Sequence, residues 1–298
     1  MIEPLNNRIM LAKLRDLIEK AREEAYALGA FNTCNLEMTQ GIIRAASNMK
    51  SPLVVQVSET TISYAGLKAI TRIVRSVVET EGKDAPIALH LDHGRSFRSI
   101  VECIKAGFSS VQIDAADLSF EENVALTRQV VEFAHSKDIF VQGELGTIPG
   151  LRGQLKNNHK NNVIEYTDPL QAKEYVQRTD IDSLAVSVGT SHGLYRAEIR
   201  FDILEEIRSL VDIPLVLHGA SGETRQDVRK AIQSGVNNIN IDTELRFAFT
   251  QALKDFFSKD KEEIDPRKIL ACGRDAVQKV VEEKLDLVGS VGQARLVV

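Results

Sequence analysis

One stretch decides the fold of this chain: Ile87-Ala88-Leu89-His90-Leu91-Asp92-His93-Gly94. Its first part has the apolar composition of a buried strand, and it runs directly into an acid, an imidazole and a glycine. Two further segments, 183–193 and 213–219, have the same design, and each ends on a histidine followed by glycine. Three predicted strands therefore each carry one His-Gly pair at or just beyond their carboxyl end.

Strand-length apolar runs recur along the chain, and amphipathic stretches with helical periodicity, such as 119–136, lie between them. The eight predicted strands are Gly29–Thr33, Pro52–Ser58, Ile87–His93, Ser110–Asp114, Ile139–Glu144, Ser183–Val188, Pro214–His218 and Asn238–Asp242. Strands that alternate with helices indicate a parallel sheet, and eight is the number that closes a barrel. An open doubly wound sheet is the alternative, but no early turn has the GxGxxG pattern typical of it.

The sequence therefore predicts an α/β protein with a TIM (β/α)8 barrel, an additional N-terminal helix and a C-terminal helical extension. The length of 298 residues allows two ordinary domains or one barrel. No linker or low-complexity segment interrupts the pattern, so residues 1–298 are predicted to form one domain. The hydrophobic fraction of 43% and the charged fraction of 27% are typical of a globular protein with a sizeable core.

Composition also limits the location and the partners. No apolar run reaches the length of a membrane span, and the N-terminus lacks the basic-then-apolar order of a signal peptide. Cys34, Cys103 and Cys272 are far apart and form no CxxC pair, so we expect reduced thiols and a cytoplasmic location. A net charge of -5 and an aromatic content of 5% argue against binding of nucleic acid. A small molecule is the expected partner.

Three histidines stand at equivalent places in the predicted barrel. His93, His192 and His218 follow the third, sixth and seventh strands, and the carboxyl ends of barrel strands meet at one mouth. Three neutral imidazoles with one open position suit a catalytic zinc ion. Each histidine taken alone is more typical of a core or surface residue, and His90, inside its strand, is expected to pack or to hydrogen-bond. The shared His-Gly pattern favours the zinc site.

Acidic side chains lie beside these histidines. Asp92 precedes a predicted ligand, where its carboxyl group can move a proton next to a bound metal, and we predict it as the catalytic acid and base. The alternative is an aspartate that caps the following helix. Asp114 and Glu144, at the ends of the fourth and fifth strands, are predicted to orient the ligands or to hold a second cation. A plain salt bridge is the alternative for both.

Two segments after the last strands carry small and polar residues. They are His218-Gly219-Ala220-Ser221-Gly222 after the seventh strand and Asn240-Ile241-Asp242-Thr243 after the eighth. Barrels commonly bind phosphate at this place, through backbone N–H groups and a helix N-terminus. The Gly-Ala-Ser-Gly segment alone is only a weak turn signal. Its place after the seventh strand and beside a predicted metal ligand indicates a phosphate site.

These motifs, in this order, resemble the class II, metal-dependent ketose-bisphosphate aldolases of the fructose- and tagatose-bisphosphate type. The resemblance covers nearly the whole chain, through GAFNTCNLEMTQ, HLDHG, AGFSSVQIDAADLSFEENVALT, ELG, SVGTSHG, LHGASG, NINIDTE and DPRK. It implies reversible cleavage of a ketose 1,6-bisphosphate, or of a related phosphorylated ketose, to dihydroxyacetone phosphate and an aldehyde. It also implies a zinc ion and a monovalent cation, Na+ or K+, near the phosphate. We expect a homodimer or homotetramer.

The resemblance gives a role to each matching position. His93, His192 and His218 would be the zinc ligands, and Asp92 the catalytic acid and base. Arg267 in DPRK resembles an arginine that contacts the far phosphate, either in its own subunit or in a neighbouring one. The dihydroxyacetone phosphate half would be held by Gly193, Gly219, Ala220, Ser221, Asn240, Ile241, Asp242 and Thr243.

The predicted lid, residues 146–167, departs from the family pattern. Members commonly have acidic residues after a paired-glycine turn, and one of these handles the proton at C3. This segment instead has Arg152, Lys156 and Lys160, and no acid before Glu165. The lid therefore predicts either slower protonation at C3 or a more anionic substrate. Two other functions stay open: a metal-dependent sugar-phosphate isomerase or epimerase, and a sugar-phosphate-binding relative without turnover.

Overall fold

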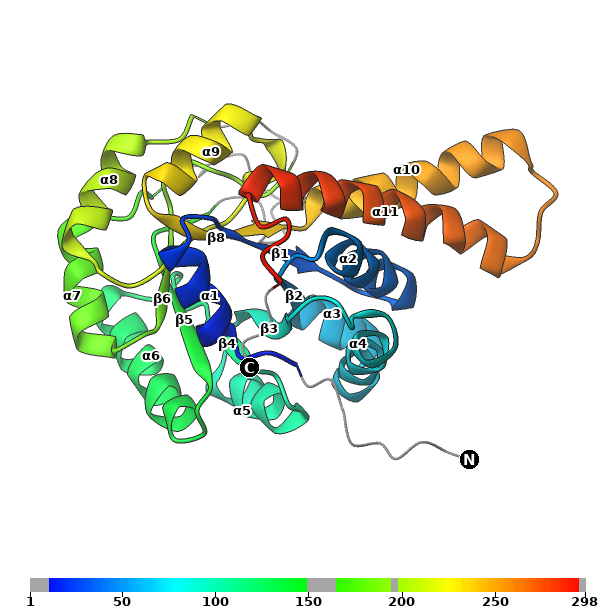
Figure 1. Ribbon diagram of the computed structural model, residues 1–298. Coiled ribbons are helices and arrows are strands. Elements are labelled where there is room, and N and C mark those ends of the chain that lie inside the picture. The colour runs from blue at the N-terminus through cyan, green and yellow to red at the C-terminus, as the bar shows by residue number, and fades with distance from the viewer. Residues whose placement is uncertain (1–10, 149–164, 194–197, 295–298) are drawn as a thin grey trace, which may run out of the picture.

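Eight parallel strands close the barrel. The computed structural model describes residues 11–148, 165–193 and 198–294. Each strand pairs with its neighbours in sequence, and β8 pairs with β1 (Figure 1). The strands are β1 (Leu28–Asn32), β2 (Leu53–Ser58), β3 (Ile87–Gly94), β4 (Ser110–Ile113), β5 (Phe140–Leu145), β6 (Ser183–Val186), β7 (Leu215–Leu217) and β8 (Val236–Ile241). The predicted TIM barrel is confirmed with all eight of its strands, although β6 ends two residues before its predicted end.

Helices follow the strands and cover the outside of the barrel (Figure 1). Many begin after a residue whose side chain accepts a hydrogen bond from the first turn, such as Asn35, Ser96 and Asp168, because the first N–H groups have no partner inside the helix. The helices are α1 (Leu14–Glu23), α2 (Leu36–Met49), α3 (Glu59–Ala65), α4 (Leu67–Glu81), α5 (Phe97–Ala106), α6 (Phe120–His135), α7 (Pro169–Thr179), α8 (Phe201–Leu210), α9 (Arg225–Gln233), α10 (Thr243–Lys259) and α11 (Pro266–Val288), with a 3-10 turn, η1 (Ala220–Gly222). The predicted N-terminal helix is α1, and the C-terminal extension consists of α10 and α11.

The amino end of the barrel is apolar. Leu28, Val54, Ala88 and Phe140 belong to one buried cluster with the apolar face of α1. That face carries Leu14, Leu17, Ile18 and Ala21 at helical spacing, so the helix buries a continuous stripe of side chains. The additional N-terminal helix therefore closes the end of the barrel opposite to the strand ends that carry the histidines.

Polar side chains fill the next level of the interior. Gln56 pairs in register with His90, and His90 pairs with Ser110. Gln112 pairs in the same way with Gln142, and all five residues are buried. His90 Nδ1 shares a hydrogen bond of 2.9 Å with Ser110 Oγ, which confirms the packing and hydrogen-bonding role expected for this histidine. This band of polar side chains supports the residues at the mouth.

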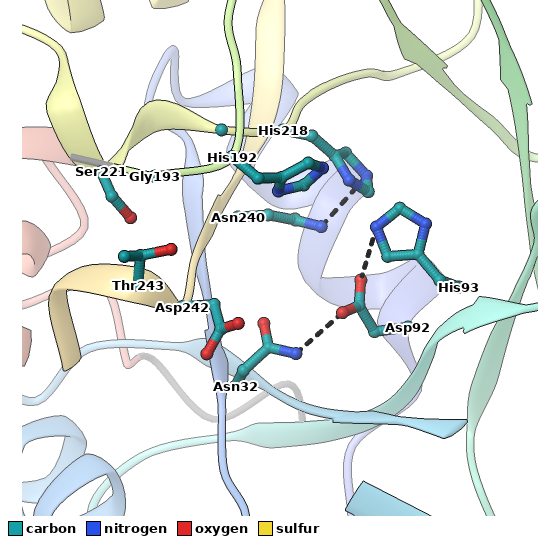
Figure 2. Close-up of a pocket in the computed structure, with 11 residues that line it drawn as sticks. Asn32, Asp92, His93, His192, Gly193, His218, Ser221, Asn240, Asp242 and Thr243 are labelled. Atoms are coloured by element: carbon teal, nitrogen blue, oxygen red, sulfur yellow. Dashed lines mark hydrogen bonds and ion pairs between the residues drawn. The ribbon is translucent and has the colours of Figure 1, made fainter. Parts of the chain in front are cut away.

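β3 becomes irregular where it reaches the mouth. Its register against β4 shifts between Leu91 and Gly94, and His93 has a φ of 50°, in the left-handed region. The N–H of His93 donates to Gln112 Oε1 at 2.9 Å. In a regular strand Asp92 and His93 would point to opposite faces of the sheet. The bulge turns the second side chain, so that both point into the mouth (Figure 2).

α10 and α11 form a long antiparallel hairpin beside the barrel (Figure 1). α11 returns along α2, and Gly41 makes the close approach possible, because a Cβ there would lie 2.7 Å from the carbonyl oxygen of Arg274. The end of the hairpin, where α10 stops and α11 begins, projects away from the barrel (Figure 1).

The predicted lid is described only at its two ends. Thr167 N donates to Ser187 O at 2.9 Å, and Ser187 Oγ donates to Thr147 O at 2.9 Å, so both ends are joined to the loop after β6. The basic residues Arg152, Lys156 and Lys160 lie outside the described residues. Among the helices that are described, none is both long enough and apolar enough to span a membrane.

Candidate active site

The barrel brings three histidines together at its mouth. His93 comes from β3, His192 from the loop after β6, and His218 from the residue after β7 (Figure 2). The ring centroid of His93 lies 4.9 Å from that of His218 and 5.6 Å from that of His192, and the His192 and His218 centroids are 6.0 Å apart. One ring nitrogen of each lies within 4.8 Å of the others. The three rings thus surround one small volume.

Each ring keeps a nitrogen that makes no hydrogen bond among the described residues. His93 Nδ1 shares a hydrogen bond of 2.8 Å with Asp114 Oδ2, which leaves Nε2. His192 Nε2 and His218 Nδ1 are buried and make no hydrogen bond among the described residues. Buried nitrogens without partners are costly unless something fills the space between them. Three imidazole nitrogens that face one point form a donor set that fits zinc.

Burial sets the charge of the histidines. Desolvation lowers the pKa of His192 to about 3 and the pKa of His218 well below its ordinary value, and the nearby His93 is a further cause for both. At His93, burial acts in the same direction, but the charge of Asp92, the hydrogen bond to Asp114 and the charge of Glu144 together raise the pKa to about 9. Two rings are therefore neutral at pH 7. The third lies where acidic neighbours favour a positive charge.

Asp92 lies beside the histidine cluster, with one carboxylate oxygen held by a hydrogen bond and the other making no hydrogen bond among the described residues. Asn32 Nδ2, at the end of β1, donates to Oδ2 at 2.8 Å. Oδ1 lies 3.8 Å from His93 Nε2 and accepts no hydrogen bond from the described residues (Figure 2). The helix that follows is capped by Ser96, whose side chain accepts from Ser99 N. Asp92 is therefore not the cap of α5, and its free oxygen lies at the mouth.

The two other acids expected at the mouth lie behind His93. Asp114 Oδ2 binds the ring of His93, and Glu144 Oε2 accepts from Gln112 Nε2 at 2.6 Å. Glu144 Oε2 also lies 3.7 Å from His93 Nδ1. Burial raises the pKa of Glu144 to about 8, and the charge of Asp114 adds to this effect. Both acids therefore contact His93 or a group that positions it.

Two amides hold the ring of His218. Asn240 Nδ2 donates to His218 Nε2 at 3.1 Å, and Gln142 Nε2 donates to the same nitrogen at 3.2 Å. Asn238 Nδ2 in turn donates to Asn240 Oδ1 at 2.8 Å. The sequence placed Asn240 among the substrate-binding residues. In the structure its amide nitrogen is engaged by the histidine, although Asn240 also lines the cavity at the mouth.

A small cavity lies between the histidines and the ends of the last strands. Gly219, which follows His218, has a φ of 70°, and a Cβ there would lie 2.6 Å from Ser191 O. Only glycine fits this position without strain. Burial raises the pKa of Asp242 to about 6, against the opposing charge of Arg246. The lining residues are Asn32, Asp92, His93, His192, Gly193, His218, Gly219, Ser221, Asn240, Asp242 and Thr243.

Most residues of the predicted phosphate site line this cavity. Gly193, Gly219, Ser221 and Thr243 do so, and Thr243 is the first residue of α10, where helix N–H groups favour an anion. The side chains of Ala220 and Ile241 are buried and do not line it. The part of the cavity farther from Asp92 therefore has the small residues, the hydroxyl groups and the helix end that a phosphate group requires.

A second and larger cavity, of about 1130 Å³, adjoins the first. The two share Asn32, Asp92, His93 and Asp242. From these residues the second cavity extends over the loop after β1, the start of α2, the end of β2, α3 and the loops after β3 and β4. The free carboxylate oxygen of Asp92 thus lies where the two cavities meet.

Arg267 lies outside both cavities of its own chain. It is the second residue of α11, at the projecting end of the hairpin, and its side chain is 90% exposed. Its guanidinium pairs with Asp265 at 2.9 Å. A contact between Arg267 and a substrate in this site therefore requires a neighbouring subunit.

Sequence reasoning missed three residues that hold the site together. Asn32 binds Asp92, Gln112 binds Glu144 and the N–H of His93, and Gln142 binds His218. Each lies near the carboxyl end of a predicted strand, which is the same rule that found the histidines. The rule was applied to side chains with typical metal or acid chemistry, and amides gave no such signal.

Comparison with known proteins gives consistent results along the whole chain. A family model described as fructose-bisphosphate aldolase class-II matches residues 12–293. The fructose-bisphosphate aldolase of Geobacillus stearothermophilus is 41% identical over 95% of this chain and 99% of that protein. The fructose-bisphosphate aldolase of Thermus caldophilus is 41% identical over 96% of this chain and 100% of that protein. The crystal structure of the YdjI aldolase from Escherichia coli K12 is 34% identical, covers 96% of this chain and 100% of that chain, and has a TM-score of 0.83.

Proposed function

Because this chain belongs to the class II fructose-bisphosphate aldolase family, we propose that it is zinc-dependent and acts on a ketose 1,6-bisphosphate or a related phosphorylated ketose. The chain is a class II aldolase, a carbon–carbon lyase. The proposed reaction is reversible cleavage to dihydroxyacetone phosphate and an aldehyde. One observation carries the proposal: a free carboxylate oxygen of Asp92 lies beside three buried histidines, each with an available ring nitrogen.

The three imidazoles hold the zinc ion in this proposal. His93 offers Nε2 and His218 offers Nδ1, the nitrogens opposite their hydrogen bonds to Asp114 and to the two amides, and His192 offers a ring nitrogen that makes no hydrogen bond among the described residues. With Nδ1 of His218 on the metal, the proton of that ring is on Nε2, so the amide of Gln142 or of Asn240 presents its oxygen to it. When bound, zinc supplies Lewis acidity that polarises the ketose carbonyl and stabilises the negative charge left after cleavage. Asp114 orients the ring of His93, while Gln142 and Asn240 orient the ring of His218. Such outer contacts fix ring orientation and strengthen metal binding.

Asp92 moves the proton of the reaction. Its free Oδ1 takes the proton from the C4 hydroxyl of the ketose, the C3–C4 bond breaks, and C4 becomes the carbonyl carbon of the aldehyde. The electron pair of the broken bond stays on the three-carbon half. In the direction of condensation the same oxygen returns the proton to the oxygen on C4. Asn32 holds Oδ2 at 2.8 Å, so it fixes the direction in which Oδ1 points.

The phosphate of the three-carbon half is placed at the far side of the smaller cavity. Gly193, Gly219 and Ala220 supply backbone, and Ser221 and Thr243 add hydroxyl groups. Backbone of Asn240, Ile241 and Asp242 completes the proposed set. Interaction with a group far from the reacting bond orients the substrate, which is how remote binding energy contributes to catalysis.

Two further cations were expected, one from the acids Asp114 and Glu144 and one from the family resemblance. For Asp114 and Glu144 we propose the orientation of His93 rather than a second divalent cation, because each acid already accepts a short hydrogen bond from a neighbouring side chain. A monovalent cation, Na+ or K+, near the phosphate remains part of the proposal.

The proposed assembly is a homodimer or homotetramer. The projecting hairpin supports it, because Phe257 and Ile264 near its end are 41% and 90% exposed, and exposed apolar side chains commonly mark contact surfaces. Such an assembly is needed for Arg267 to reach the substrate of a neighbouring subunit. We further propose a cytoplasmic location and one domain over residues 1–298. The location is supported by three cysteines without disulfides.

An activity screen tests the proposed function. Fructose 1,6-bisphosphate, tagatose 1,6-bisphosphate and other phosphorylated ketoses are supplied to zinc-loaded protein and to chelated protein, and triose phosphate is measured. Zinc-dependent release of dihydroxyacetone phosphate is the expected result. Conversion of the ketose without triose release would show an isomerase or epimerase instead. Binding without any conversion would show a relative without turnover, and both outcomes contradict the proposal.

A further inference from the structure

The second cavity is the place for the aldehyde half of the substrate. It meets the smaller cavity at Asp92, which lines both. If the proposed function holds, Asp92 acts at C4, so the bond that breaks lies at this junction. The phosphate of the three-carbon half occupies the smaller cavity. The carbons from C4 onward must therefore extend into the larger one.

The lining of the larger cavity includes hydroxyl groups and charges of both signs beside apolar atoms. Ser58, Thr60 and Ser63 contribute hydroxyl groups that suit the hydroxyls of a sugar chain. Two arginines line it. The guanidinium of Arg246 is paired with Asp242 at 2.8 Å, whereas that of Arg95 makes no ion pair or hydrogen bond with any described residue.

Arg95 is held close to the reacting end of the cavity. It lies three residues after Asp92, and three residues of chain span at most about 11 Å. Its N–H donates to Glu59 Oε1 at 2.8 Å, which ties the loop after β3 to the start of α3. The next residue, Ser96, caps α5 through Ser99 N. The backbone of this arginine is thus fixed on both sides, while its side chain is exposed and pairs with none of the described residues.

We propose that Arg95 recognises an anionic group at the far end of the aldehyde half of the substrate, and so determines specificity. The proposal rests on the proposed aldolase function. A guanidinium binds phosphate and carboxylate by the same pair of parallel N–H donors, so either group satisfies the geometry. Glu59 and Asp117 also line the cavity, and their charges disfavour an anion unless it pairs directly with the guanidinium.

The experiment uses condensation of dihydroxyacetone phosphate with three aldehydes of equal chain length. They are glyceraldehyde 3-phosphate, tartronate semialdehyde, which carries a carboxylate, and neutral glyceraldehyde. The kcat/KM for each is measured with the zinc-loaded full-length protein and with Arg95→Gln. The matched control is Arg98→Gln, because Arg98 lies on the same segment but is 87% exposed, pairs with Glu102 and lines neither cavity.

Arg95→Gln should reduce kcat/KM for the preferred anionic aldehyde by about ten- to a hundredfold, the usual contribution of a charge-assisted hydrogen bond. The neutral aldehyde should change less than about threefold, which is within the effect of a surface substitution. Arg98→Gln should leave all three values unchanged. The aldehyde with the larger loss identifies phosphate or carboxylate as the natural terminus.

A second reaction separates failure of this inference from failure of the proposed function. Exchange of the C3 proton of dihydroxyacetone phosphate with solvent needs only the smaller cavity, so Arg95→Gln should leave its rate unchanged. Normal exchange with equal losses for all three aldehydes, or with no loss for any, would overturn the role of Arg95. Absence of exchange and of condensation in the unchanged protein would overturn the proposed function itself.

Discussion

The two cavities that meet at Asp92 are built from different parts of the barrel. The smaller one is formed largely by residues at strand ends, such as His93, His218 and Asn240, which are buried and hydrogen-bonded to other strand residues. The larger one is lined mainly by the start of α3 and by loops, including the exposed Tyr64 and Arg95. The sheet therefore carries the groups that need fixed geometry, and the loops carry groups that contact the variable part of a substrate.

The largest expected effect comes from the histidines. His93→Ala, His192→Ala and His218→Ala each remove one of three nitrogens that face a common point. Zinc content should fall from about one per chain to nearly none, and cleavage and proton exchange should both fall at least about a thousandfold, because metal contributes several kcal/mol to such steps.

Elemental analysis after zinc reconstitution checks this prediction, and His135→Gln is the control. His135 hydrogen-bonds Asp182 at 2.9 Å and lines neither cavity. Normal zinc content in all three alanine variants would contradict a zinc site in the smaller cavity. It would also contradict the different roles assigned to the two cavities.

The next effect concerns Asp92, where the two cavities meet. Asp92→Asn should keep zinc but lose at least about a hundredfold in cleavage, the usual contribution of a general acid or base. Exchange at C3 of dihydroxyacetone phosphate should fall by less, because that reaction involves no C4 hydroxyl. Zinc content, cleavage and exchange are measured on the same preparation. Near-normal cleavage with normal zinc would exclude the proposed role of Asp92.

A smaller effect is expected for Asp114, which holds the ring of a proposed zinc ligand. Asp114→Asn removes the charge that binds the ring of His93, so zinc affinity should fall about ten- to a hundredfold. Competition with a coloured chelator measures the affinity without turnover. Asp117→Asn is the matched control, three residues farther along the same loop and exposed. Equal affinity in both variants would mean that Asp114 does not support the zinc site.

Two serines compare the cavities directly. Ser221→Ala in the smaller cavity should weaken binding of dihydroxyacetone phosphate about two- to tenfold, the value of one hydrogen bond. Ser63→Ala in the larger cavity should leave that affinity unchanged and raise only the KM for the ketose. Calorimetric titration and steady-state kinetics give the two values. A loss of dihydroxyacetone phosphate affinity in Ser63→Ala would show that the cavities do not divide the substrate at Asp92.

The last prediction concerns pH and the metal-free protein. The pKa of His93 is raised to about 9 and that of Glu144 to about 8, both above their ordinary values. A folded state that binds protons more tightly than the unfolded chain loses stability as pH rises through the raised pKa. The free energy of unfolding should therefore decrease between pH 6.5 and 9.

Urea unfolding in the presence of a chelator measures this decrease. Glu144→Gln removes one of the two groups and should make the decrease smaller. Bound zinc should largely abolish it, because the metal replaces the proton on His93. A metal-free protein whose stability rises over this range would contradict the assignment of a protonated His93.

The fold and the main site residues could be predicted from local sequence patterns. Eight apolar runs with helical stretches between them identify the barrel, because the spacing of apolar residues follows directly from strand and helix geometry. The rule that reactive groups lie at the carboxyl ends of barrel strands then selects Asp92 and the three histidines. The amides Asn32, Gln112 and Gln142 follow the same rule, yet an amide in a strand is equally typical of a purely structural residue.

The sequence by itself determined the barrel, the order of its strands and the chemical types at its mouth, because these depend on periodicity and on position along the chain. Only the tertiary structure decided which nitrogen of each ring is available, since this depends on partners distant in sequence, such as Asp114 for His93 and Asn240 for His218. The bulge that turns His93 into the mouth likewise arises from pairing with β4. The tertiary structure also decided that Arg95 lines the larger cavity and that Arg267 lies outside it. Side chains that become neighbours across loops leave no periodic signal in the chain.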